Sequence, residues 1–421
     1  MKLISKPKEK IDWNLNIRYG MLQACYWFVT ASTMVYVVAL LRDRGFTSAG
    51  IGEILAAKYL AAVVSQFVLS YIVDKLARKI SLKMVIYFLS GLCAIVTFLF
   101  WQIHMGYIGT MICYALFGCT INGVYPYINA MATKYTKAGR KVYYSYARGA
   151  GSVMWGISSV IISWSVESFG IESVLVIQLI MVLLQLACAI MMDKVPPMVE
   201  TEKKAGQVHS YGYLFRHYPG YTLFLIASVC MFIANNLLST YMVDIVSRVG
   251  GGNPELGYVE MALAIFELPP AVLFVTLSKK LNVRIILFIS IVSTFIQIVL
   301  TLFAGSVPML IFAQVFQIFG VGMYWAASVY YVSQEIPEQD WVKGQALINI
   351  CSLGMGGVVG SLLSGRIMEC FGLTRTLQCS AGIVAIGIVI MFAGMRISMN
   401  AEKRKNRSRK NRRRSYGEFY V

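Results

Sequence analysis

The chain has 421 residues, of which 57% are hydrophobic and only 14% are charged, and its formal net charge is +18. Soluble proteins carry about 25% charged residues, so this composition argues against a soluble enzyme. Apolar runs of roughly 20 residues, each long enough to cross a hydrocarbon core of about 30 Å, recur from end to end. The sequence therefore predicts an all-α membrane protein that crosses the bilayer many times.

The apolar runs, taken in chain order, predict twelve transmembrane helices. The expected spans are 17–41, 50–73, 83–103, 107–132, 144–165, 171–192, 220–246, 256–277, 284–304, 307–333, 344–368 and 374–396. Residues 1–16 are basic and polar, and the first run is too long for the core of a signal peptide, so no cleavable signal is expected. Residues 193–219 are polar and rich in Pro, Lys and Glu, which is typical of a linker.

Basic residues are concentrated in alternate loops. They precede the first expected span and follow the second, fourth, sixth and eighth, whereas the intervening loops hold few. By the positive-inside rule this asymmetry places both termini on the cytoplasmic side of the cell membrane. The net charge then reflects topology, and we expect the basic tail 397–421, with its run "KRKNRSRKNRRR", to contact anionic lipid rather than nucleic acid.

The linker divides the expected spans six and six, and a weak internal repeat supports the division. "GIGEILA" (50–56) resembles "GYVEMAL" (257–263), and each opens an even-numbered span. We therefore expect a cytoplasmic segment 1–16, a six-helix bundle 17–192, a cytoplasmic linker 193–219, a second bundle 220–396 and a cytoplasmic tail 397–421. Two pseudo-symmetric six-helix bundles suggest a binding site at the midplane between them.

The stretch "YIVDKLARK" (71–79) ends the second expected span. It resembles the loop motif of the major facilitator superfamily, an acidic residue followed by a basic cluster, although Ser70 and Ala77 stand where the motif has glycines. The resemblance implies a cytoplasmic gate made by Asp74, Arg78 and Lys79. The alternative is a basic cytoplasmic loop without a gating role.

Further stretches resemble the branch of that superfamily that contains the lactose, nucleoside and phenylpropionate permeases. They are "GFTSAGIGEILAA", "PYINA", "YSYARGAGSVMW", "FELPP" and "GQALINICSLGMGGVVGSLLSG". In the lactose permease the arginine matching Arg148 binds sugar hydroxyls, the tryptophan matching Trp155 stacks on the sugar ring, and the glutamate matching Glu267 contributes to sugar binding. The resemblance thus implies substrate-binding roles for these three residues.

Three ionisable residues lie deep in apolar spans: Lys58, Arg148 and Glu267. Such residues are costly in hydrocarbon and usually face a bundle interior or a watery cavity. Arg148 would bind solute, hydrogen-bond to carbonyls or reach the interface. Glu267 would bind solute and carry a coupling proton, or pair permanently with Arg148. Lys58 would add a cation that favours an anionic or hydroxylated solute, or be tethered to a carbonyl or to Glu53.

The chain also departs from the lactose permease. Asn129 stands in place of a second sugar-binding glutamate, Gln317 in place of the coupling histidine, and Gly320 in place of a further glutamate. The galactoside site and the proton relay of that protein are therefore not preserved. The resemblance still implies proton symport, and the alternatives are uniport or a different coupling arrangement. Other candidates come from the spans expected to line the cavity, where amides and aromatic rings suit polar ring-shaped solutes: Tyr26, Asn122, Asn235 and Trp325.

These features favour a non-enzymatic secondary transporter without cofactor or metal, since no nucleotide-binding loop, cofactor motif or metal-ligand spacing is present. We expect a monomer that moves a small polar organic solute by alternating access, with a proton as the favoured coupling ion. Sugar or oligosaccharide is the first choice, followed by nucleoside or organic acid. The alternative is a membrane sensor or lipid-handling protein on the same scaffold.

Overall fold

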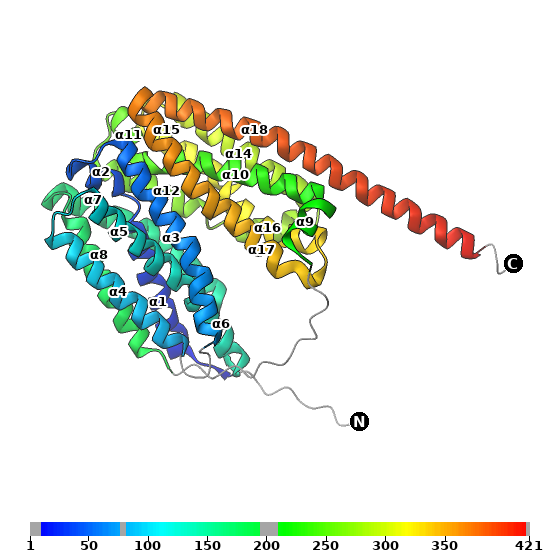
Figure 1. The fold of residues 1–421 in the computed structure, drawn as a ribbon, viewed down its shortest axis with the longest axis horizontal. Helices are drawn as coiled ribbons and strands as arrows, with labels where there is room; N and C mark the ends of the chain where they lie inside the picture. Colours follow the sequence, from blue (N-terminus) through cyan, green and yellow to red (C-terminus); the bar gives the residue numbers. More distant parts are fainter. Residues whose placement is uncertain (1–9, 76–80, 194–208, 418–421) are drawn as a thin grey trace.

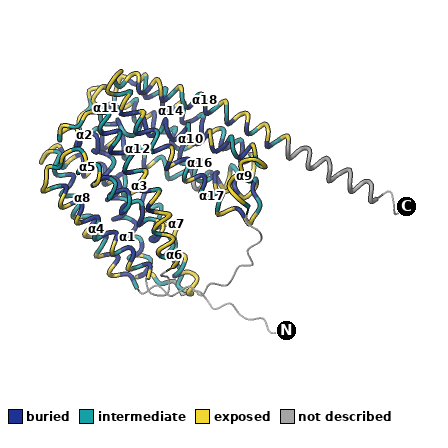
Figure 2. Tube along the Cα trace, viewed as in Figure 1, coloured by how far each residue is buried: buried dark blue, intermediate teal, exposed yellow. Residues whose placement is uncertain are grey.

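The computed structural model describes residues 10–75, 81–193 and 209–417, which are almost entirely helical (Figure 1). Two short parallel strands, β1 (Lys10–Ile11) and β2 (Arg140–Lys141), pair near the N-terminus. Many large apolar side chains are exposed, as expected for surfaces in contact with lipid. The buried positions run through the interior of each group of helices (Figure 2).

The first half of the chain forms one group of helices. Its elements are α1 (Trp13–Ser32), α2 (Val37–Asp43), α3 (Ser48–Lys75), α4 (Leu82–Gln102), α5 (Tyr107–Phe117), the π-helical turn η1 (Gly118–Asn122), α6 (Gly123–Lys137), α7 (Tyr144–Phe169) and α8 (Ser173–Met191). Pro126 in α6 cannot donate a backbone hydrogen bond to the carbonyl one turn earlier, and the π-helical turn lies directly before this point.

The second half repeats this plan after the short helix α9 (Tyr211–His217). Its elements are α10 (Pro219–Thr240), α11 (Met242–Arg248), α12 (Asn253–Phe266), α13 (Pro270–Leu277), α14 (Val283–Phe303), α15 (Val307–Gln314), η2 (Val315–Ile318), α16 (Val321–Glu335), η3 (Glu338–Asp340), α17 (Trp341–Asn349), η4 (Ile350–Met355) and α18 (Gly356–Gly417). The first span of each half is interrupted, between α1 and α2 and between α10 and α11, and the fourth span of each half is interrupted as well.

Within the described ranges, nine helices are long and apolar enough to cross a bilayer, or ten if α1 and α2, which are bent by 45°, form one span. The twelve expected spans are consistent with this number. The number nine takes the two arms of α18 as one helix, although α18 reverses direction at Gly372, where φ is 76° (Figure 1). The number nine also excludes α12 and α13, which are each too short to span a bilayer alone. The last helix continues to Gly417, beyond the expected end at 396.

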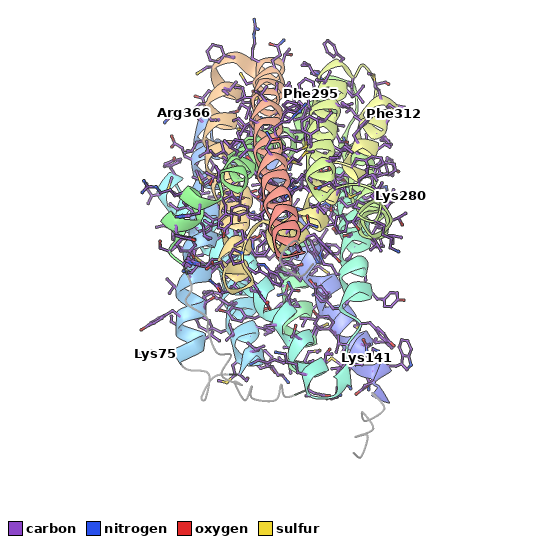
Figure 3. All side chains as sticks on the ribbon, turned by 90° about the vertical axis from the view of Figure 1, so that its right-hand side faces the viewer. Lys75, Lys141, Lys280, Phe295, Phe312 and Arg366 are labelled. Atoms are coloured by element: carbon purple, nitrogen blue, oxygen red, sulfur yellow. The ribbon has the colours of Figure 1, made fainter. Side chains whose placement is uncertain are left out.

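Two hydrophobic cores divide the molecule. One is built mainly from residues of the first half and the other mainly from residues of the second half, with a small exchange of side chains where the halves meet. Figure 1 shows two bundles that meet near α2 and α11 and diverge away from that end. We call the end at α2 and α11 the closed end and the opposite end the open end. Lys75 and Lys141 lie at the open end of the first bundle, and Arg366 lies at the closed end (Figure 3).

The two bundles are joined by packing of α7 on α12 and of α3 on α18. On the α3–α18 seam, a Cβ added to Gly52 would lie 2.4 Å from the Ser361 carbonyl oxygen, and one added to Gly365 would lie 2.6 Å from the Ser48 carbonyl oxygen. Only glycine permits such close backbone contact. An ion pair between Arg42 and Asp244, at 2.8 Å, also crosses the closed end.

Candidate functional site

Arg148 occupies the second turn of α7, between the two bundles. Its guanidinium lies 4.2 Å from the centre of the Trp27 ring, and Nη1 donates a hydrogen bond to Ser152 Oγ at 3.1 Å. A cation above a tryptophan face is attracted by the ring quadrupole. Arg148 is thus held by a ring and a hydroxyl, which leaves donors of its fork for a further partner.

An aromatic wall continues from Trp27. Tyr26 stacks on Tyr125 with ring centres 4.8 Å apart, and Trp27 contacts Tyr125 edge-on at 5.6 Å and Trp155 at 6.2 Å. Gln23 Nε2 donates to Asn129 Oδ1 at 3.1 Å on the same side of the bundle. Tyr26, Arg148 and Trp155 thus share Trp27 as a neighbour, and Asn129 is bound through Gln23, one turn before Tyr26 on α1; all come from the first half of the chain.

Glu267 lies at the point where α12 ends, because the following Pro269 and Pro270 cannot continue its hydrogen bonds. Its half-buried carboxylate accepts a hydrogen bond from Gln317 Nε2 at 2.9 Å. The charge of Arg148 attracts it through space, but in this conformation Arg148 and Glu267, both described residues, form no ion pair with each other. The permanent pair considered from the sequence is therefore not formed in this state.

Lys58 is 3% exposed, in the middle of α3. Its Nζ donates to the backbone carbonyl of Thr33 at 3.3 Å. That carbonyl is available because the helical hydrogen bonding is interrupted between α1 and α2. Of the two structural tethers considered from the sequence, the carbonyl is the one present. Glu53 instead accepts from the Tyr107 hydroxyl and lies 3.9 Å from Arg366.

Sequence reasoning missed Glu260. This residue is 6% exposed, and its Oε2 accepts from Trp155 Nε1 at 3.4 Å. It lies only a few residues inside its predicted span, as does Glu53, its counterpart in the internal repeat, and neither was counted among the deep ionisable residues. The available signal was its spacing, since Glu260 and Glu267 are seven residues apart and share a helix face.

The helices α7 and α12 are antiparallel and in register. Asn253 donates to Glu167 at 2.8 Å, a Cβ on Gly257 would contact Ser163, and a Cβ on Gly156 would contact Met261. Arg148 and Trp155 are also seven residues apart, about 10 Å along a helix. The register thus forms two levels: an outer level with Trp155 and Glu260, nearer the closed end, and an inner level with Arg148 and Glu267.

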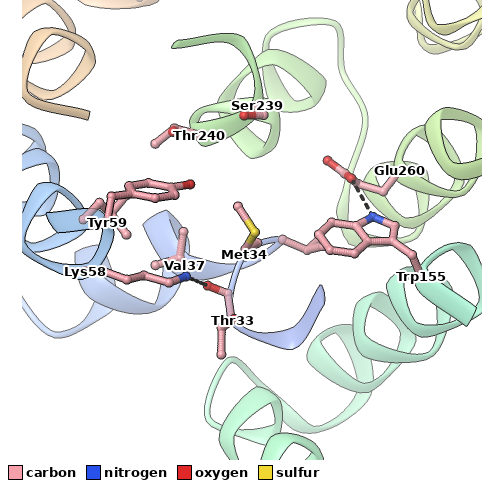
Figure 4. A pocket seen from close by; sticks show the side chains of 11 residues that line it. Thr33, Met34, Val37, Lys58, Tyr59, Trp155, Ser239, Thr240 and Glu260 are labelled. Atoms are coloured by element: carbon pink, nitrogen blue, oxygen red, sulfur yellow. Dashed lines mark hydrogen bonds between the residues drawn. The ribbon is translucent and has the colours of Figure 1, made fainter. Parts of the chain in front are cut away.

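A small pocket lies at the outer level (Figure 4). It is lined by Thr33, Met34, Val35, Val37, Leu55, Lys58, Tyr59, Trp155, Ser239, Thr240 and Glu260. Figure 4 shows Lys58 and Glu260 on opposite sides of it. Both bundles contribute: Thr33 lies in the interruption that follows α1, and Ser239 and Thr240 are the last two residues of α10, directly before its interruption. Discontinuous helices with exposed backbone are a recurring feature of transporter binding sites.

Some buried polar atoms around the two levels have no hydrogen-bond partner within the protein. They are Gln23 Oε1, Trp27 Nε1 and Gln317 Oε1. Buried polar groups are nearly always satisfied, so these atoms suit a solute or water in the space between the bundles. The four ionisable side chains are divided between the halves: the two bases, Lys58 and Arg148, come from the first bundle, and the two acids, Glu260 and Glu267, from the second.

The remaining predicted residues are less closely connected. Trp325 packs on Phe232, with ring centres 5.3 Å apart, in the core of the second bundle. Asn122 ends the π-helical turn η1, and Asn235 is half-buried in α10. No hydrogen bond joins these two described residues to the other candidates. Of the predicted gate, Arg78 and Lys79 and the side chain of Asp74 lie outside the described residues.

Comparison with known proteins agrees with this architecture. The MFS_1 like family matches residues 19–379. The chain belongs to this family. No curated protein matches the chain.

Solved structures agree in fold. A crystal structure of a point mutant of the nucleoside transporter NupG covers 90% of this chain and 100% of its own with a TM-score of 0.78 at 15% identity. A bacterial homolog of the human lysosomal transporter Spinster, in an inward-facing and unoccupied conformation, covers 93% of this chain and 98% of its own with a TM-score of 0.68 at 13% identity. The TM-scores show that these chains share one fold, the fold of the major facilitator family to which the chain belongs.

Proposed function

We propose that this protein is a secondary active transporter that moves a small polar solute across the cell membrane by alternating access. The observation that carries the proposal is the placement of Lys58, Arg148, Glu260 and Glu267 between two bundles that diverge at one end. Ionisable groups at this depth are costly unless they serve a solute pathway. Sugar or oligosaccharide is our first choice of solute, and nucleoside, the class named for the structurally similar NupG, is the second.

The buried Glu260 changes the expectation about solute charge. Lys58 and Arg148 alone would favour an anion, whereas two bases facing two acids balance each other and favour a solute without net charge. This balance makes an organic acid a less suitable solute than a sugar or a nucleoside. Hydroxyl groups suit the site because they accept hydrogen bonds from Lys58 and Arg148 and donate to the carboxylates.

The open end faces the cytoplasm in this proposal. Lys75 and Lys141 lie there (Figure 3), as the positive-inside rule requires of cytoplasmic loops. The structure is then inward-facing, both termini are cytoplasmic, and the bundles 17–192 and 220–396 are the rocking units around a cytoplasmic linker and tail. We further propose a monomer, a cytoplasmic gate formed by Asp74, Arg78 and Lys79, and proton symport in which Glu267 carries the proton.

The decisive experiment is uptake of labelled sugars and nucleosides into proteoliposomes that contain the purified protein. Accumulation of one of them above its external concentration, driven by an imposed proton gradient, supports the proposal. A sensor would bind the solute without moving it, and a lipid-handling protein would instead move labelled lipid between leaflets. Either result would overturn the proposal.

A further inference from the structure

We propose that the pocket between Lys58 and Glu260 is a distinct outer subsite that receives the hydroxylated ring of the solute, one level beyond Arg148 and Glu267. This inference rests on the proposed transport function and deepens it. The pocket draws on both bundles, since Lys58 comes from α3 and Glu260 from α12 (Figure 4). A ring held there would therefore contact both moving units at once.

The first reason is the unused hydrogen-bonding capacity of Lys58. An ammonium group has three donors, and Nζ uses one of them on the Thr33 carbonyl, at a long 3.3 Å. Lys58 is 3% exposed, and neither Lys58 nor Glu260, both within the described part of the chain, forms an ion pair. A buried charge with so few partners carries a desolvation cost that a ligand would offset.

The second reason is the matching capacity of Glu260. Its Oε2 accepts one weak bond from Trp155 Nε1, at 3.4 Å, while Oε1 has no partner among the described side chains. The indole of Trp155 is thereby oriented by the carboxylate and lines the same pocket. An indole face stacks well on the apolar face of a ring, so one wall of the pocket offers a stacking surface beside an acceptor.

The third reason is selectivity for hydroxyl groups. An anion would satisfy Lys58 but would be repelled by Glu260, and a cation would be repelled by Lys58. A hydroxyl group accepts from the ammonium and donates to the carboxylate, and Ser239 and Thr240 supply further hydroxyl partners in the same pocket. The ring hydroxyls of a sugar and those of the ribose in a nucleoside share this chemistry.

The test compares each ligand with its deoxy analogue. Binding to the full-length protein in nanodiscs is measured by calorimetry for glucose and its deoxy analogues and for uridine and dideoxyuridine. We expect the wild-type protein to bind at least one parent compound about tenfold more tightly than its deoxy analogue, because hydrogen bonds to charged groups are strong. The responding series identifies whether the ring belongs to a sugar or to a nucleoside.

Lys58→Met and Glu260→Gln should each reduce that ratio toward one, whereas Lys58→Arg, which keeps the donors, should retain it. Two matched controls leave the pocket intact: Lys134→Met removes a lysine of α6, and Glu53→Gln changes the repeat counterpart of Glu260. Both should keep the wild-type ratio. Size-exclusion chromatography of every variant separates loss of folding from loss of the subsite.

Several outcomes overturn the inference. It fails if the wild-type protein binds parent and deoxy compounds equally, or if the ratio persists in both pocket variants. It also fails if neither series binds. The proposed function is judged separately by the uptake experiment, because a transporter of another polar solute would still accumulate its substrate in proteoliposomes.

Discussion

At the scale of single residues, Arg148 shows how a charge is held between two bundles without an opposite charge in contact. The guanidinium rests on Trp27 and donates to Ser152, and the carboxylate of Glu267 attracts it from the facing bundle. A planar fork can keep these contacts and still donate to a bound solute, whereas an ammonium offers one compact charge.

We therefore predict that Arg148→Lys weakens solute binding by roughly ten- to hundredfold, the size expected when hydrogen bonds from a charged group are lost. Binding measured by calorimetry on the purified protein checks this prediction. Ser152→Ala is the matched control, since it removes only the hydroxyl that Arg148 contacts, and it should cost much less. Wild-type affinity in the lysine variant would contradict a ligand role for Arg148.

Glu267 offers a second test at this scale. We predict that Glu267→Gln abolishes uphill accumulation of the solute, because the amide cannot take up the coupling proton, while exchange of labelled for unlabelled solute across proteoliposomes persists. The amide can still accept a hydrogen bond from Gln317, now 2.9 Å from the carboxylate, so the local packing should survive. Unchanged accumulation would assign the proton to another residue.

The sequence predicted part of this site. Depth in an apolar span identified Lys58, Arg148 and Glu267, and the resemblance to the permeases gave Trp155. Glu260 was missed because it lies only a few residues inside the predicted span 256–277. The hydropathy of that span does not show that the residue is buried in the folded protein. A carbonyl tether for Lys58 was considered from the sequence, but its identity as Thr33 could not be predicted, because it depends on where α1 is interrupted.

At the scale of elements, the seam between α3 and α18 is built from glycines. Gly52 and Gly365 bring two backbones together, and a Cβ on Gly52 would lie 2.4 Å from the Ser361 carbonyl oxygen. Main-chain atoms cannot move aside as a flexible side chain can, so any side chain here must push the helices apart. The closed end therefore depends on these two positions having no side chain.

We predict that Gly52→Ala shifts the protein toward conformations that are open at this end. Spin labels at Asp43 and Ser247, on α2 and α11, would then be farther apart, as measured by double electron–electron resonance. The exposed Cys370 and Cys379 are replaced before labelling. Gly91→Ala is the control, because a Cβ there meets no atom within 4 Å. In a helix interior that change should stabilise slightly, by about 0.5–1 kcal/mol. Equal distances in the two variants would contradict the prediction.

The elements themselves were predicted well where the apolar runs are long and unbroken, as in α4, α8 and α14. The interruptions were not. Pro126, Pro269 and Pro270 mark two of them in the sequence, but the interruptions after Ser32 and Thr240 contain neither proline nor glycine. Without such residues, the local sequence pattern gave no signal for either interruption.

At the scale of the whole molecule, the two bundles are also tied by the ion pair of Arg42 and Asp244. It is bidentate, with oxygen–nitrogen distances of 2.8 and 3.2 Å, but the Arg42 side chain is 44% exposed. Exposed ion pairs contribute only about 0–1 kcal/mol. The packing of glycines, rather than this pair, should therefore decide which state is the more stable.

We accordingly predict that Arg42→Gln changes the ratio of the two states by no more than about fivefold, which corresponds to the upper limit for an exposed pair. The same spin-label distances measure the ratio. High salt should reproduce most of the effect in the wild-type protein, because it screens exposed charges, and should have little effect on the variant. A shift as large as that of Gly52→Ala would show that the ion pair dominates instead.

The order of the two levels along α7 and α12 has a kinetic consequence. If the bundles pivot about the closed end, Trp155 and Glu260 lie on a shorter lever arm than Arg148 and Glu267, so a given rotation separates the first pair less than the second. A bound molecule would then detach in sequence, first from the arginine and afterwards from the tryptophan. Release toward the open end would then proceed in two steps, and the contacts nearest the pivot would break last.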